Sequence, residues 1–167
     1  MTLDQIPKND IVLIDANIIL YALRDKSAQC KRLIRRCVER EIFSVITSHI
    51  LAEVTHRLMM VEARENGWIT GANPARQLSE QPERVKVLIR YEQAIKNLLA
   101  TGIRLESLEK EDFITMMRVQ RESGLLTNDA LLVACAERLR VQGIASADQQ
   151  LSNVRGIILY SPDDIKE

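Results

Sequence analysis

Aliphatic and polar positions are distributed along the chain in a pattern that predicts strands alternating with helices. Residues 11–14, Ile-Val-Leu-Ile, form an unbroken aliphatic run, which is typical of a strand buried on both faces of a parallel sheet. Further strands are expected at 42–46, 103–105, 144–147 and 157–160. Between them, apolar side chains recur at helical spacing, and the expected helices span 17–24, 28–40, 48–65, 83–100, 107–123 and 127–142. This alternation predicts an α/β fold with a mostly parallel central sheet.

The length of 167 residues is enough for a single domain, and we expect it to span residues 1–167. Its least regular part, 65–82, is expected to be an elaborated loop between two long helices, with a brief helix starting at Asn73-Pro74. Trp68 lies in this segment. It could anchor the loop to the body of the domain, or mark a contact with a subunit or a substrate.

Composition narrows the class of protein. Hydrophobic residues make up 46% of the chain and charged residues 28%, a mixture typical of soluble globular proteins. No apolar run approaches the ~20 residues of a membrane helix, and the first ten residues lack a signal-peptide pattern. Three cysteines without metal-ligand spacing favour a reducing cytoplasm. Basic and acidic residues balance at 23 each, so net charge does not indicate nucleic-acid binding.

Two acidic residues directly follow strands. Asp15 ends the run at 11–14, and Asp148 follows the small-residue strand at 144–147. Ligands of open α/β sheets bind beyond the carboxyl ends of strands, so residues at these positions are candidates for binding or catalysis. Asp15 could equally be no more than the N-cap of the next helix.

Two further acids lie near the starts of helices, Glu53 in the second turn after strand 42–46 and Asp129 in the first turn of helix 127–142. Glu53 could simply pair with Arg57 at i,i+4, and Asp129 could simply favour the helix dipole. If the strands are parallel, however, all four acids converge on one sheet edge. Such closeness requires a cation, and an oxygen-only ligand set favours Mg²⁺ or Mn²⁺.

With these residues in place, the chain resembles the PIN-domain family of metal-dependent ribonucleases, which includes the toxins of VapBC toxin–antitoxin pairs. The resemblance runs from about Val12 to Tyr160. It is carried by Ile14-Asp15-Ala16-Asn17, by Glu53, by Thr127-Asn128-Asp129-Ala130-Leu131, and by Ser146-Ala147-Asp148. Each motif is short, and their order and placement carry the recognition.

The resemblance implies a PIN-like three-layer sandwich, a central sheet of four to five strands with helices on both faces. It implies an endoribonuclease whose metal-binding and catalytic quartet is Asp15, Glu53, Asp129 and Asp148, with Mg²⁺ or Mn²⁺ as cofactor. Asn17 and Ser146 would support the site by hydrogen bonds. Family precedent also implies a homodimer and an antitoxin partner if the chain is a toxin.

The basic helix at 28–40 offers a surface for the RNA substrate. The residues expected to contact the RNA backbone are Lys31, Arg32, Arg35 and Arg36, although a charged helix face is more often simply solvated. An alternative function is a catalytically inactive PIN-like module that binds RNA or protein, which retention of all four acids disfavours. A phosphatase or receiver domain would need an Asp-x-Asp or paired acids, and the sequence has Asp15-Ala16-Asn17 instead.

Overall fold

The computed structural model describes residues 1–165 and has a five-stranded sheet in the order β3-β2-β1-β4-β5. All four strand pairs are parallel. The strands are β1 (Ile11–Ile14), β2 (Phe43–Thr47), β3 (Arg104–Glu106), β4 (Gly143–Ala145) and β5 (Ile158–Tyr160). Val12, Leu13 and Ile14 of the central strand are fully buried, as the unbroken aliphatic run predicts. The predicted α/β class and parallel sheet are therefore confirmed.

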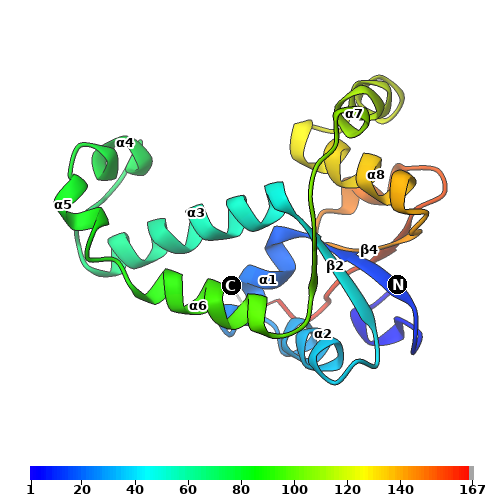
Figure 1. Ribbon diagram of the computed structural model, residues 1–167, viewed down its shortest axis with the longest axis horizontal. Helices are drawn as coiled ribbons and strands as arrows, with labels where there is room; N and C mark the ends of the chain where they lie inside the picture. Colours follow the sequence, from blue (N-terminus) through cyan, green and yellow to red (C-terminus); the bar gives the residue numbers. More distant parts are fainter. Residues whose placement is uncertain (166–167) are drawn as a thin grey trace.

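Helices cover both faces of this sheet (Figure 1). The helices are α1 (Ala16–Leu23), α2 (Ala28–Val38), α3 (Ser48–Glu65), α4 (Pro74–Ser79), α5 (Pro82–Val85), α6 (Arg90–Ala100), α7 (Lys110–Ser123) and α8 (Thr127–Leu139). Right-handed crossovers place α1, α2, α3 and α6 on one face and the α7–α8 pair on the other. Short 3₁₀ helices at Leu3–Gln5 and Gln149–Asn153 complete the fold. None of the helices described is long and apolar enough to cross a membrane.

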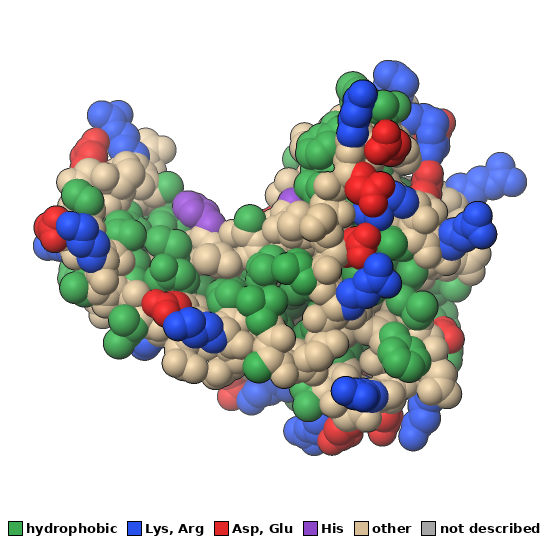
Figure 2. Space-filling view, in the orientation of Figure 1, with side chains coloured by type: hydrophobic (Ala, Val, Ile, Leu, Met, Phe, Trp, Pro, Cys, Tyr) green, Lys and Arg blue, Asp and Glu red, His purple; other side chains and the backbone are tan. Residues whose placement is uncertain are grey.

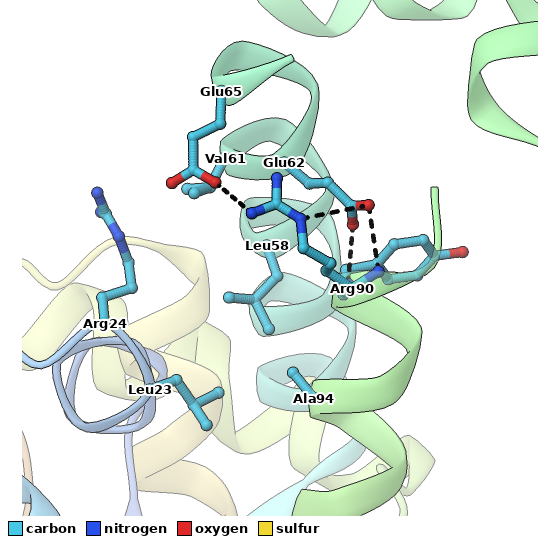
Figure 3. Close-up of a pocket in the computed structure, with 9 residues that line it drawn as sticks. Leu23, Arg24, Leu58, Val61, Glu62, Glu65, Arg90 and Ala94 are labelled. Atoms are coloured by element: carbon cyan, nitrogen blue, oxygen red, sulfur yellow. Dashed lines mark hydrogen bonds and ion pairs between the residues drawn. The ribbon is translucent and has the colours of Figure 1, made fainter. Parts of the chain in front are cut away.

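The helix predicted at 83–100 is wrong as one element, because the chain forms α5 and α6 with a break between them. The buried Glu62 carboxylate of α3 explains the break. It accepts backbone hydrogen bonds from Ile89, Arg90 and Tyr91 at 2.9–3.1 Å and so provides a cap at the start of α6 (Figure 3). A cap supplied by a neighbouring helix leaves no local sequence signal.

The segment at 65–82 contains α4 and, with α5, projects from the body of the molecule (Figure 1 and Figure 2). It has a small apolar cluster of its own, built on Ala63, Ile69, Leu78 and Leu88. Trp68 packs against this cluster, and the guanidinium of Arg84 lies 5.4 Å from its ring centroid. Trp68 therefore anchors the lobe formed by residues 65–88, which is the structural alternative that the sequence left open.

Candidate active site

Asp15 lies where the strand order reverses. β1 and β4 are neighbours, but the chain leaves β1 toward β2 and leaves β4 toward β5, which opens a crevice at their carboxyl ends. Asp15 is only 6% exposed. Its Oδ1 accepts a hydrogen bond from the backbone N–H of Ala16 at 2.6 Å, so the residue does cap α1. Its Oδ2 faces other partners, so N-capping of α1 accounts for only one of the two carboxylate oxygens.

Asn17 and Ser146 connect Asp15 to the end of β4. Asn17 Nδ2 donates to Asp15 Oδ2 at 2.5 Å, and Ser146 Oγ donates to the same oxygen at 2.6 Å. Asn17 Oδ1 accepts from the backbone N–H of Ala147 at 3.0 Å. Ser146 Oγ accepts from the backbone N–H of Asp148, also at 3.0 Å. These two side chains therefore fix the position of Asp15 relative to the segment that carries Asp148.

Glu53 and Asp129 come together through a contact between the starts of α3 and α8 (Figure 1). Asn128 Nδ2 donates to Glu53 Oε2 at 2.8 Å, and His49 Nε2 lies 3.3 Å from the carbonyl oxygen of Asn128. Glu53 also pairs with Arg57 at 2.9 Å, the i,i+4 interaction that the sequence suggested. Glu53 can pair with Arg57 and still lie near Asp129, because its two oxygens face different partners.

The carboxyl of Asp129 is affected by the negative charges of the other three acids. Burial raises its pKa, and the negative charges of Asp15, Asp148 and Glu53 raise it further, to about 6. Burial also raises the pKa of Asp15, against hydrogen bonds that lower it, with a smaller upward contribution from Glu53. Asp148 accepts a hydrogen bond from the backbone N–H of Gln150 at 2.8 Å and caps the 3₁₀ helix after β4. Asp129 is therefore within electrostatic range of the other three carboxylates.

The donor chemistry of this cluster fits a hard divalent cation. All four groups offer carboxylate oxygens, and the mutual repulsion felt by Asp129 is the kind that a bound cation relieves. Among residues 1–165, no three acidic, histidine or cysteine side chains lie close enough to share one ion as they stand. Glu53 is held by Arg57 and Asn128 instead. A cation held by all four acids would therefore require their side chains to rotate toward the crevice.

The four basic residues predicted to contact RNA lie on α2, which packs on α1 and lies beyond α1 from α3 (Figure 1). Lys31 pairs with Asp25 at 2.8 Å. Arg32 forms a two-bond pair with Asp4 at 2.6 and 3.1 Å, and Arg36 donates to the carbonyl of Ile6 at 2.7 Å. Arg35 is exposed. The structure does not bring these residues to the acidic cluster.

The sequence did not indicate the roles of Asn128 and His49 around the site. Leu126 occupies the N-cap position of α8, and the Asn128 side chain donates to Glu53. His49 Nδ1 lies 3.0 Å from Thr47 Oγ1, and burial lowers the pKa of the His49 imidazole. The polar residues at the start of α3 and α8 were the only available signal.

Comparison with known proteins agrees with this architecture. The PIN domain family model matches residues 12–157, which is most of the chain. No curated protein matches significantly. Among solved structures, VapBC2 from Rickettsia felis, bound to a DNA fragment from its promoter, aligns with a TM-score of 0.59 at 12% identity, covering 92% of this chain and 99% of that one.

Two further structures align over similar lengths. A toxin–antitoxin complex from Klebsiella pneumoniae gives a TM-score of 0.58 at 16% identity, covering 88% of this chain and 95% of that one. VapC20 from Mycobacterium tuberculosis, a toxin that cleaves the sarcin–ricin loop, gives 0.53 at 16% identity, with coverage of 84% and 92%. At these identities the solved structures establish a shared fold. The family match over residues 12–157 shows that the chain belongs to the PIN-domain family.

Proposed function

We propose that this protein is an endoribonuclease that hydrolyses RNA phosphodiester bonds with Mg²⁺ or Mn²⁺ held by Asp15, Glu53, Asp129 and Asp148. One observation carries the proposal. Asn17 and Ser146 position Asp15 at the strand-order reversal, within electrostatic range of Asp129. A fold maintains a half-buried cluster of like charges at a cost to its stability, and a functional site is the usual reason.

The proposed ligands have different roles in the site. A bound divalent ion would activate water and stabilise negative charge on the phosphate and the leaving oxygen. Asp15 is the fixed member of the quartet, because three side-chain and backbone donors hold its two oxygens. Glu53 is the adjustable member, since its partners Arg57 and Asn128 are themselves exposed. Asp129 must lose its proton before it can act as a ligand.

We further propose that the protein is the toxin of a toxin–antitoxin pair and acts as a homodimer. Support for a toxin comes from its likeness to the Rickettsia felis and Klebsiella pneumoniae structures, both of which contain toxin–antitoxin components. The exposed side chains of Phe113, Ile114 and Met117 on α7 provide an apolar surface for self-association. Light scattering tests the homodimer, and inhibition of growth on expression tests the toxin.

Incubation of the purified protein with RNA tests the proposed activity. We expect cleavage with Mg²⁺ or Mn²⁺, none with a chelator, and none by Asp15→Asn or Asp129→Asn variants with unchanged circular dichroism. Cleavage that survives in both pure variants would contradict the assignment of the quartet. RNA binding without cleavage by the wild type under any divalent ion would favour the inactive binding module.

A further inference from the structure

A groove between α1 and α3 adjoins the acidic cluster. It has a volume of about 390 Å³ and is lined by Asn17, Leu20, Tyr21, Arg24, His56, Arg57, Met60, Val61 and Arg64. Two of these residues connect it to the proposed catalytic site, because Asn17 hydrogen-bonds Asp15 and Arg57 pairs with Glu53. The lining contains three arginines and a histidine but no acidic residue. Although the chain is neutral overall, this groove therefore has the charge of a polyanion-binding surface.

Two of the arginines have no acidic partner within the described part of the chain. Arg24 and Arg64 are exposed, and neither side chain forms an ion pair or hydrogen bond with any residue from 1 to 165. On α2, by contrast, Lys31 and Arg32 are already engaged by acids. An arginine without an acidic partner can contact a phosphate without first breaking an ion pair.

The apolar part of the lining provides surfaces for nucleobases. Tyr21 is half-buried beside Arg24, and Met60 and Val61 face the same groove from α3. Aromatic and aliphatic side chains can pack on a base only when its face is free of neighbouring bases. The combination of cationic and apolar groups therefore matches a single strand better than a duplex.

The adjoining groove between α1, α3 and α6 provides an internal comparison (Figure 3). It shares Arg24 and Val61 with the first groove but also contains Glu62 and Glu65. Arg90 is held between these two acids, at 3.7 Å from Glu62 and 2.8 Å from Glu65. Acidic lining and a neutralised arginine make this second groove unsuitable for a phosphate backbone. Charge complementarity thus selects the groove beside Asn17.

We infer that the α1–α3 groove binds the single-stranded part of the RNA substrate next to the cleavage site, with Arg24, Arg57 and Arg64 contacting phosphates and Tyr21 packing on a base. This inference rests on the proposed ribonuclease function and specifies its substrate path. Arg57 also links the groove to the proposed cation site, because it lines the groove and pairs with Glu53. RNA that draws Arg57 away would free Glu53 for its proposed role at the cation site.

Binding measured without cleavage tests the inference. Fluorescence anisotropy would follow a labelled single-stranded RNA of about 12 nucleotides, within the site sizes of single-strand grooves, in the presence of a chelator. For Arg24→Ala/Arg64→Ala we expect about tenfold weaker binding and a slope of log K against log salt that is smaller by roughly 0.7 for each lost contact. Tyr21→Leu should weaken binding about fivefold while barely affecting the same RNA annealed to its complement.

A matched control removes the same charge elsewhere. Arg121→Ala/Arg155→Ala deletes two exposed arginines outside the groove and should change affinity less than about twofold. Equal weakening by both double variants, or none by Arg24→Ala/Arg64→Ala, would overturn the inference. Equally strong competition by a polyglutamate peptide would overturn it too, in favour of an acidic protein segment. Because the assay contains chelator, failure of the proposed cleavage activity would not change its result.

Discussion

Ser146 Oγ donates a hydrogen bond to Asp15 Oδ2 at 2.6 Å, across 131 positions of sequence. The bond joins the carboxyl ends of β1 and β4, the two strands between which the order of the sheet reverses. It holds one oxygen of the most buried proposed ligand in a fixed direction, and it does so without adding charge. The geometry of the site therefore depends on a neutral side chain that orients a proposed ligand.

Substitution Ser146→Ala tests this positioning role. We expect it to weaken Mn²⁺ binding about 10- to 100-fold, the usual effect of losing a residue that orients a ligand. The free energy of unfolding should fall by only about 1–2 kcal/mol, because one buried hydrogen bond is lost. Calorimetric titration with Mn²⁺ measures the first quantity and urea denaturation the second. Ser79→Ala, which removes an exposed hydroxyl on α4, is the control and should change neither. Unaltered Mn²⁺ affinity in Ser146→Ala would contradict the positioning role.

The substitution Asp129→Asn should stabilise the cation-free protein at neutral pH. The pKa of this carboxyl is about 6 in the folded protein, above its ordinary 3.8, so the folded state binds the proton more tightly. That contribution to stability is complete below 3.8 and is lost as pH rises through about 6. An amide cannot ionise, so the variant should unfold a few degrees higher than the wild type at neutral pH.

Thermal unfolding in chelator across this pH range measures the difference. It should vanish at pH values below 3.8 and reach its full size above about 6. Glu111→Gln, at an exposed position in the first turn of α7, should show no such gain. A wild type as stable as Asp129→Asn at neutral pH would show that the repulsion among the acids is negligible.

Glu62 is expected to stabilise the fold without serving the active site. Burial would raise its pKa, but hydrogen bonds from the backbone of Tyr91, Arg90 and Ile89 outweigh burial, and the pKa lies below its ordinary 4.5. Its contribution is therefore present above pH 4.5 and is lost as pH falls through the lowered value. Glu62→Ala should cost about 2–3 kcal/mol at neutral pH, by urea denaturation.

The neighbouring Glu65 provides the comparison, because it pairs with the same Arg90 at 2.8 Å but is half-exposed. Glu65→Ala should cost no more than about 1 kcal/mol, as expected of a surface ion pair. An equal cost for the two variants would mean that Glu62 contributes as an ion-pair partner of Arg90 and not as the cap of α6.

Features that depend on local sequence were predictable. The aliphatic run at 11–14 specifies a buried strand, and strand–helix alternation specifies a parallel sheet. The position of Asp15 at the carboxyl end of a strand of that sheet followed directly. The order of the strands did not follow from the sequence. That order matters, since it is what makes β1 and β4 neighbours and brings Ser146 to Asp15.

Features that depend on distant partners were not predictable. The two-bond pair of Arg32 with Asp4 engages a cation that the sequence left available for RNA. The capping of α6 by Glu62, 27 positions before Ile89, breaks a helix that periodicity predicted as continuous. The α1–α3 groove likewise brings Arg24 next to Arg64, and only the packing of two helices creates it. Local sequence patterns therefore predicted the strands and helices that carry the site. The contacts around the site depend on tertiary packing and were not predicted.

Carboxylates from four separate segments are proposed to bind a divalent cation together, and Mn²⁺ titration of the wild type and single variants tests this most directly. We expect Mn²⁺ to bind the wild type and raise its melting temperature. Asp15→Asn and Asp129→Asn should each lose more affinity than the roughly 10- to 100-fold expected of supporting residues. The exposed Glu111→Gln should behave as the wild type. Unchanged Mn²⁺ affinity in Asp15→Asn and Asp129→Asn would contradict the account.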